Sequence, residues 1–294
     1  MEFELPRPTG DQEKSSGRSL KVAVLTAVPY LVSTLSTRLQ QMGHVPVGTI
    51  GPRRKVTAGR PPGLEAVSAP EGNPICLVGD PTEVESTLQS LRPDVMVSWG
   101  FPWRVPGPAL YVPHLGSINY HPSLLPRHRG PNPIGWALRM GDERTGVTWH
   151  RMDVEYDHGR ILAQKPVELA PGDDPEAILM RLTSVALRLL PGVLELVQAG
   201  DPGWVQAEDQ ATDAPAFTDD YLTIDWHGTA RSVHNQVRAW SFSAGVRRVR
   251  GPLAVIDGTT VRVTRTSLEY AEGGNRIECA DAPIWVTGFE SVDE

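Results

Sequence analysis

Apolar and polar positions along the first part of the chain predict short buried strands separated by helices. Five apolar runs, each short enough for one buried strand, lie at 21–26, 44–50, 74–78, 94–99 and 116–120. Leu31, Leu35 and Leu39 recur at helical spacing between the first two runs, and a second helical segment covers about 81–91. Buried strands that alternate with helices are typical of a parallel sheet. The pattern therefore predicts an α/β fold.

The rest of the chain divides at a change of composition after Asp201. Before it, a long helical pattern begins at Asp174, a candidate N-cap followed by Pro175, and continues to Gly200. After it comes an acidic, loop-rich stretch, followed by one more helical pattern and several short β-like runs. We therefore predict a flexible N-terminal arm (1–18), a first domain (19–204), a linker (205–215) and a small C-terminal β domain (216–294).

The net charge of −7 is concentrated at the C-terminal end of the chain. Fourteen Asp and Glu residues and eight Arg residues lie at 205–294, and no lysine follows Lys165. Neutralising nucleic-acid phosphates requires clustered Lys and Arg. The second half of the chain is therefore a poor candidate for a large nucleic-acid footprint, and we expect a small-molecule partner instead.

Several features favour a cytoplasmic protein. The two cysteines, Cys76 and Cys279, lie far apart and match neither a metal-ligand spacing nor a disulfide framework. The N-terminal residues lack the apolar stretch of a signal peptide, and no uncharged apolar run is long enough to span a bilayer. We therefore expect no membrane partner, and homo-oligomerisation through the C-terminal domain is left open.

The residues best suited to chemistry follow the last of the five apolar runs. Asn119 and His121 are two residues apart, so both side chains point to the same face of a strand. In open α/β sheets, the carboxyl ends of the strands carry the ligand crevice. A second polar cluster lies in a turn between two β-like runs, where Asp157 is followed by Gly159, which can take a strained backbone conformation. These two segments are the candidate site.

The same residues resemble the pattern of a known enzyme family. The run Asn119-x-His121-Pro-Ser-Leu-Leu-Pro126 with Gly130, followed thirty-six positions after the histidine by Asp157-x-Gly, is similar to the motif of the formyltransferases that use 10-formyltetrahydrofolate. The family includes enzymes that formylate methionyl-tRNA, glycinamide ribonucleotide, amino sugars and hydroxyornithine, and a hydrolase of the donor. The resemblance covers nearly the whole chain after the arm. It implies a Rossmann-like, mostly parallel formyltransferase domain with a C-terminal partial open barrel, similar to an OB fold.

The resemblance implies a catalytic set of Asn119, His121 and Asp157. Moving a formyl group to an amine passes through a tetrahedral species with negative charge on oxygen, so a preplaced donor such as the Asn119 amide is required. His121 is implied as general acid and base, because the ammonium must lose protons while the folate nitrogen gains one. Asp157 is implied to orient the imidazole and favour its charged form. The scheme requires no metal.

The resemblance also implies where the folate donor binds. Its pterin ring is expected along the loop after the fourth apolar run and against the backbone of the Ser-Leu-Leu-Pro loop. The residues expected to bind it are Trp99, Phe101, Trp103, Ser123, Leu124, Leu125 and Pro126. The aromatic residues among them are equally compatible with a place in the core. One departure from the family pattern is His158, which occupies a position where many relatives have threonine.

The formyl acceptor is less well defined by the sequence. The acidic C-terminal part, shorter than in the tRNA-acting members, favours the amine of a small molecule, such as an amino acid, a hydroxylamine or an amino sugar. Methionyl-tRNA formyltransferase is the main alternative, supported by the similarity along the chain and by a basic loop at 53–60. Two further alternatives are a formyltetrahydrofolate hydrolase and a binding paralogue without catalytic activity.

Overall fold

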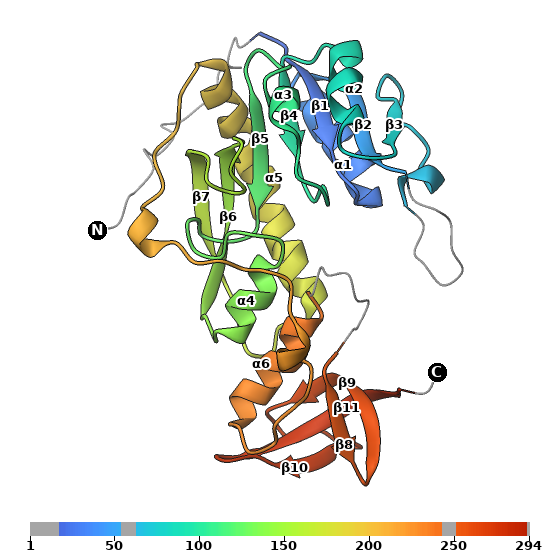
Figure 1. Ribbon diagram of the computed structural model, residues 1–294, viewed down its shortest axis with the longest axis vertical. Helices are drawn as coiled ribbons and strands as arrows, with labels where there is room; N and C mark the ends of the chain where they lie inside the picture. The colour runs from blue at the N-terminus through green and yellow to red at the C-terminus, as the bar shows by residue number, and fades with distance from the viewer. Residues whose placement is uncertain (1–17, 54–62, 243–250, 293–294) are drawn as a thin grey trace.

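A computed structural model describes residues 18–53, 63–242 and 251–292. These residues form a seven-stranded sheet flanked by helices and a four-stranded sheet at the opposite end of the molecule (Figure 1). The predicted α/β class with a small C-terminal β unit is confirmed. The predicted N-terminal arm apart from Arg18, and the basic loop at 53–60 apart from Arg53, lie outside the described residues.

The larger sheet is parallel except at one edge. Its strands are β1 (Lys21–Leu25), β2 (Val45–Pro52), β3 (Ile75–Val78), β4 (Val95–Ser98), β5 (Ser117–His121), β6 (Arg144–Arg151) and β7 (Ile161–Glu168). They lie in the order β3-β2-β1-β4-β5-β6-β7, and the pairs β5–β6 and β6–β7 are antiparallel. Every residue of β4 is buried, as expected of a central strand covered on both faces.

Helices cover the two faces of this sheet. The helices of the described chain are α1 (Pro29–Gln41), α2 (Glu83–Leu91), α3 (Gly107–Leu110), α4 (Pro133–Arg139), α5 (Pro175–Gln198) and α6 (Ala230–Trp240). The buried side chains of α1 and α5 belong to one core, and those of α2 and α3 belong to a second core. The two cores therefore enclose the sheet from opposite sides.

Helix α5 begins where the sequence predicts it. The Asp174 side chain accepts a hydrogen bond from the Ala177 N–H at 2.7 Å, which is the expected N-cap. By length and composition this helix would also suit a membrane. Its apolar stripe, however, packs into the core of the larger sheet, with residues such as Leu182, Leu190 and Val193 fully buried. We therefore interpret α5 as a core helix.

The smaller sheet is antiparallel and packs against α6. Its strands are β8 (Leu253–Ile256), β9 (Thr259–Ser267), β10 (Asn275–Glu278) and β11 (Pro283–Ser291), in the order β10-β11-β9-β8. Helix α6 supplies Val233 and Val237 to the core of this unit. On the same helix, His234 bonds to Thr266 Oγ1 and to the carbonyl oxygen of Pro171, each at 2.9 Å, which ties the two units together.

The chain direction places the candidate residues in the middle of the molecule. The parallel strands begin at the end farthest from the smaller sheet, and their carboxyl ends point toward α4 and the smaller sheet (Figure 1). Asn119 and His121 occupy the carboxyl end of β5. The loop between β6 and β7 begins beside the amino end of β5, because β6 pairs antiparallel with β5, and Asp157 in this loop contacts His121 and the Gly130 N–H. The topology therefore brings the two sequence motifs together.

Candidate active site

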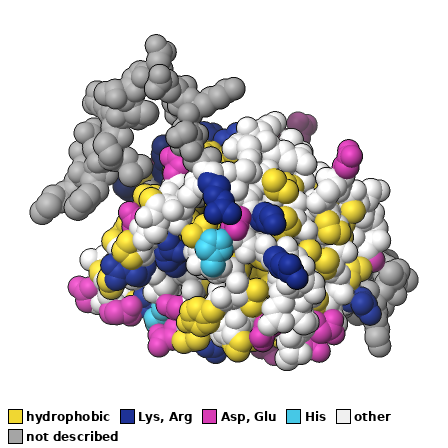
Figure 2. Space-filling model, turned by 90° about the horizontal axis from the view of Figure 1, so that it is seen from above, with side chains coloured by type: hydrophobic (Ala, Val, Ile, Leu, Met, Phe, Trp, Pro, Cys, Tyr) yellow, Lys and Arg dark blue, Asp and Glu magenta, His cyan; other side chains and the backbone are white. Residues whose placement is uncertain are grey.

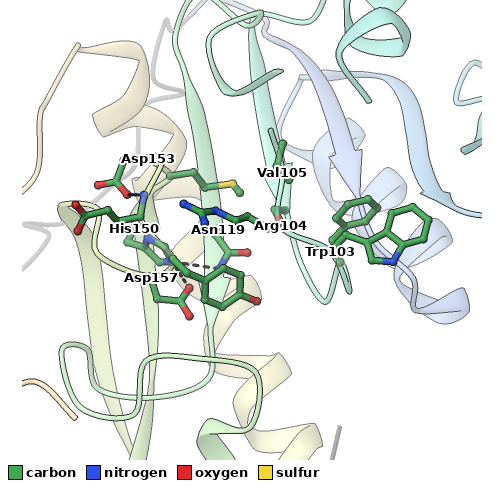
Figure 3. Close-up of a pocket in the computed structure, with 12 residues that line it drawn as sticks. Trp103, Arg104, Val105, Asn119, His150, Asp153 and Asp157 are labelled. Carbon is green, nitrogen blue, oxygen red and sulfur yellow. Dashed lines mark hydrogen bonds and ion pairs between the residues drawn. The ribbon is translucent and has the colours of Figure 1, made fainter. Parts of the chain in front are cut away.

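A cavity opens at the carboxyl ends of β4 and β5. Its lining residues come from three segments: Ser98 at the end of β4 with Phe101, Trp103, Arg104 and Val105 after it, Asn119 on β5, and His150, Met152, Asp153, Glu155, Tyr156 and Asp157 at the end of β6 and in the following loop. In Figure 3, Asn119, His150 and Asp157 converge at one side of this cavity, while Trp103 stands at the other. The cavity therefore has a polar end and an aromatic end.

Asn119 and His150 are direct partners across the β5–β6 pair. Asn119 Nδ2 lies 3.2 Å from His150 Nε2, and His150 Nδ1 lies 2.8 Å from the carbonyl oxygen of Arg151. A carbonyl oxygen only accepts, so Nδ1 carries a proton, and in the tautomer with its single proton there Nε2 accepts from the Asn119 amide. His150 thereby sets which way the amide faces. The second N–H of Asn119 remains available to donate to a bound molecule.

Asp157 lies between two histidines. Its Oδ2 atom is 3.4 Å from His121 Nδ1 and accepts a hydrogen bond from the Gly130 N–H at 2.9 Å. Its Oδ1 atom is 3.5 Å from His150 Nε2. Burial raises the pKa of the Asp157 carboxyl, but His121, His150 and the Gly130 N–H together outweigh it and hold this pKa below its usual range. Asp157 is therefore a carboxylate at neutral pH.

His121 is a buried, neutral base next to this carboxylate. Its Nε2 atom lies 2.8 Å from the carbonyl oxygen of His128, so Nε2 carries the proton of the neutral ring and Nδ1 faces Asp157. Burial lowers the pKa of His121, and the opposing effect of Asp157 is smaller. Protonation of Nδ1 would turn the 3.4 Å contact with Asp157 into an ion pair. The pair therefore has one vacant proton position.

The structure brings the predicted catalytic residues together, but they are not equally accessible from the cavity. Asn119 and Asp157 line the cavity, whereas His121 is 4% exposed and reaches it only through Asp157. His150 takes a place on the cavity wall that the sequence analysis did not assign to it. The arrangement is a continuous chain that runs from His121 through Asp157 and His150 to Asn119.

The residues predicted to bind folate divide into two groups. Phe101 and Trp103 line the cavity, with their rings in a T-shaped arrangement and 5.6 Å between centroids. Trp99 packs against Tyr120 and Trp149 in the core. The predicted residues that do not line this cavity are Trp99, Ser123, Leu124, Leu125 and Pro126.

The residues present fit the folate donor that the sequence resemblance implies. A pterin is a flat ring with apolar faces and a polar edge, which requires an apolar slot and a few convergent polar groups. Phe101, Trp103 and Val105 supply apolar walls, and the polar end with Asn119 and Asp157 lies within the same cavity.

The backbone around Asp157 is tightly constrained. Asp157 itself has φ of +60°, a left-handed backbone conformation that residues other than glycine adopt uncommonly. Two residues further on, a Cβ atom on Gly159 would lie 1.7 Å from the carbonyl oxygen of Arg151, so only glycine fits there. This close approach packs the loop onto the end of β6 and explains why Gly159 accompanies Asp157 in the motif.

Other histidines have different surroundings. The His158 ring lies 3.2 Å from Glu155 Oε2 and 3.4 Å from Arg129 Nη1, so it faces these side chains and not the Asp157 carboxylate. Within the described ranges, no three His, Cys, Asp or Glu side chains are grouped to hold a metal ion. The sequence contained one signal for His150, namely a polar residue within the apolar run Val-Thr-Trp-His, but its partner depends on strand register.

Comparisons with known proteins agree with this geometry. The model of the formyl transferase family matches residues 78–194. A methionyl-tRNA formyltransferase from Trichlorobacter lovleyi is 30% identical over 247 residues, which cover 82% of this chain and 76% of the relative.

Solved structures with low sequence identity show the same fold. HypX from Aquifex aeolicus, in complex with tetrahydrofolic acid, matches 94% of this chain and 45% of its own, with a TM-score of 0.68 and 18% identity. A sugar N-formyltransferase from Shewanella sp. FDAARGOS_354 matches 86% of this chain and 99% of its own, with a TM-score of 0.63 and 19% identity. The chain thus spans less than half of HypX.

The fold and the site together define an α/β enzyme that transfers a one-carbon group. The chain belongs to the formyltransferase family, whose formyl donor is 10-formyltetrahydrofolate. The prediction drawn from Asn119, His121 and Asp157 is confirmed at the level of the family.

Proposed function

We propose that this enzyme transfers the formyl group of 10-formyltetrahydrofolate to the amine of a small molecule, with Asn119, Asp157 and His121 as its catalytic residues. The observation that carries the proposal is the chain of contacts from His121 through Asp157 and His150 to Asn119, which ends in a cavity with aromatic walls. It combines an oriented amide donor with a carboxylate and a neutral base.

Each of these groups has a role in the transfer. The amine nitrogen forms a bond to the formyl carbon, and the bond from that carbon to N10 of the folate then breaks. The free N–H of Asn119 donates to the formyl oxygen, where negative charge grows. Asp157 accepts a proton of the amine and shares it with His121 Nδ1, and the same pair returns a proton to N10. An acceptor that enters as an ammonium also releases one proton to solvent before it attacks, and the proton balance is then closed.

The choice of a small acceptor rests on charge. Asp153, Glu155 and Asp157 lie on the cavity wall, and their carboxylates attract the ammonium group of either kind of acceptor, so the charge outside the cavity decides. Beyond residue 205 the chain has fourteen acidic residues and eight arginines. At the amino ends of the parallel strands, Figure 2 shows Lys and Arg side chains interspersed with acidic, apolar and uncharged ones. Such a mixed surface does not provide a continuous track for phosphates.

A second candidate acceptor is initiator methionyl-tRNA. The observation that favours it is the curated relative from Trichlorobacter lovleyi, which carries the name methionyl-tRNA formyltransferase. The same chemistry at Asn119 and Asp157 serves either amine, so the site alone does not discriminate between them.

The test is a direct competition between acceptors. Purified enzyme and 10-formyltetrahydrofolate are incubated with initiator methionyl-tRNA and with a panel of amino sugars, sugar nucleotides carrying an amine, amino acids and hydroxylamines. Mass spectrometry then detects the gain of one formyl group. We expect the highest kcat/KM with a small amine. Faster formylation of the tRNA than of every small amine would contradict the proposed acceptor class, and folate release without any acceptor would indicate a hydrolase.

A further inference from the structure

A buried glutamine joins the aspartate loop to two other parts of the chain. Gln206 follows α5 by eight residues and is only 4% exposed. Its Nε2 atom donates to the carbonyl oxygens of Asp157 and Gly159, each at 2.8 Å. Its Oε1 atom accepts from Arg129 Nε at 3.0 Å and from Arg129 Nη2 at 2.7 Å. Three segments far apart in sequence therefore meet at one side-chain amide.

The chemistry of these partners leaves the amide a single orientation. A guanidinium only donates and a carbonyl oxygen only accepts, so Oε1 must face Arg129 and Nε2 must face the loop. Both N–H groups and both lone pairs of the amide are then used. Glutamate has the same shape but lacks the donors, and an aliphatic side chain would leave two carbonyl oxygens and the Nε–H of Arg129 without partners. Only glutamine satisfies all four contacts.

The same segments also contact the Asp157 side chain. Arg129 precedes Gly130, whose N–H donates to Asp157 Oδ2 at 2.9 Å. The loop is thus connected to this segment twice, once through the carboxylate and once through the main chain. Asp157 has φ of +60°, which costs free energy unless neighbouring contacts enforce it. The two bonds from Gln206 lie on either side of His158, directly at this strained turn.

We propose that Gln206, oriented by Arg129, is a positioning residue that holds the Asp157 carboxylate between His121 and His150. The inference rests on the proposed function, because it assigns Gln206 a role through Asp157. Without the two bonds, the loop relaxes toward ordinary backbone angles and the carboxylate moves away from His121 Nδ1. Displacement of a catalytic group by about 1 Å reduces a rate by about 100-fold.

The outer part of the network offers a matched control. Arg129 also donates to both oxygens of Glu208, at 2.7 and 2.9 Å. The Glu208 side chain is 64% exposed, and exposed ion pairs contribute little to stability. A Glu208→Gln variant removes the charge from this pair but leaves the contacts of Gln206 in place. It is therefore expected to keep wild-type kcat and KM.

Gln206→Glu is the informative variant. It keeps the contact with Arg129 and replaces both donated bonds with repulsion between oxygens. We expect kcat to fall by about 100-fold, with little change in the KM for 10-formyltetrahydrofolate. A stability loss alone would lower the melting temperature without changing kcat per folded molecule, so circular dichroism is used to measure the folded fraction. Unchanged kcat per folded molecule in Gln206→Glu would overturn the proposal.

A second readout needs neither donor nor acceptor. The pKa of His121 is followed by NMR with labelled histidine, and its resonance is identified by its absence in His121→Gln. The charged or titratable side chains that interact with His121 are Asp157, His150 and His128. Because Asp157 raises the pKa of His121, moving the carboxylate away should lower this pKa in Gln206→Glu, whereas Glu208→Gln should leave it unchanged.

The Asp157→Asn variant distinguishes failure of the positioning role of Gln206 from failure of the proposed catalytic set. If Asp157→Asn abolishes turnover and lowers the pKa of His121 while Gln206→Glu does neither, the positioning role of Gln206 is wrong and the proposed catalytic set stands. If Asp157→Asn itself leaves turnover and the pKa of His121 unchanged, the proposed catalytic set is wrong.

Discussion

His121 and Asp157 form a buried pair in which the charge resides on the carboxylate at neutral pH. Burial lowers the pKa of His121, whereas the groups around Asp157 hold its pKa below the usual range. The pair is therefore prepared to accept one proton. In the proposed mechanism, the unprotonated pair first accepts a proton from the amine. The pair then donates this proton to N10 of the folate as the bond to the formyl carbon breaks.

The pH dependence of kcat follows from the direction of the His121 shift. In the proposed mechanism the enzyme is inactive when His121 is protonated, and the pKa of His121 lies below its ordinary value of 6.5. We expect kcat to fall toward acidic pH as His121 takes up a proton, with the midpoint of this fall below pH 6.5. A pH profile of kcat under saturating donor measures this. A midpoint above 6.5 would contradict the neutral state assigned to His121.

At the residue scale, some members of the candidate site could be predicted from the sequence alone. Asn119, His121 and Asp157 could be predicted because each lies in a short motif whose spacing is characteristic. His150 and Gln206 could not, because their roles depend on contacts between distant segments. His150 becomes a partner of Asn119 only through the register of β5 and β6, and Gln206 reaches Asp157 from beyond α5.

Which aromatic residues line the cavity could not be predicted from the sequence either. Trp99 and Phe101 stand two residues apart after the same strand, yet Trp99 packs in one core, whereas Phe101 belongs to the other core and also lines the cavity. Periodicity alone does not distinguish them, because the chain leaves the strand at Ser98 and the alternation of faces no longer applies.

At the scale of secondary-structure elements, the loop between β6 and β7 is the feature on which the site depends most. It carries Asp157 in a left-handed conformation and packs Gly159 against the end of β6. Because a carbonyl group is the obstacle at Gly159, a larger residue there requires the backbone to shift.

Gly159→Ala should therefore impair the enzyme more than other glycine substitutions. Its Cβ would lie 1.7 Å from the Arg151 carbonyl oxygen, and overpacking of this kind costs about 1–3 kcal/mol. The control is Gly172→Ala, where nothing lies within 4 Å of the new Cβ and the backbone is not left-handed. Thermal unfolding and kcat are compared for both variants. Equal behaviour of the two would contradict the tight packing of the loop.

Most elements of the larger sheet could be predicted from the sequence. Buried runs and helical periodicity place β1 to β5, α1, α2 and α5 within a few residues of their observed positions. Short elements such as α3, α4 and β10 were not predicted, because a helix or strand of four to seven residues carries too little periodicity. The antiparallel direction of β6 and β7 is set by the loops that connect them, and hydrophobicity does not encode it.

At the scale of the whole molecule, charge separates the two candidate acceptors. The unit built from α6 and the smaller sheet belongs to the acidic part of the chain, which has no lysine after Lys165. Its existence was predictable from the change in composition. Its position relative to the larger sheet was not, because contacts such as that of His234 with Pro171 join segments distant in sequence.

The salt dependence of tRNA binding tests whether the charge of the molecule disfavours tRNA as the acceptor. A protein that neutralises several phosphates loses affinity steeply as salt rises, by about 1,000-fold or more between low and moderate concentrations. We expect binding of initiator methionyl-tRNA to be weak, with a shallow dependence on salt. Fluorescence anisotropy over a salt titration measures both. Tight binding with a steep slope would instead favour the tRNA as acceptor.

The central claim is that formyl transfer takes place in the cavity lined by Asn119 and Asp157. The most direct measurement is the single-turnover rate of formyl transfer from 10-formyltetrahydrofolate, with the best acceptor of the amine panel, in wild-type enzyme and in Asn119→Asp. This change keeps the shape of the side chain but replaces its N–H donors with a charge beside Asp157. Asn275→Asp on β10 makes the same change far from the cavity. We predict a loss of about 100- to 1000-fold for Asn119→Asp and wild-type behaviour for Asn275→Asp, and a wild-type rate in Asn119→Asp would contradict the account.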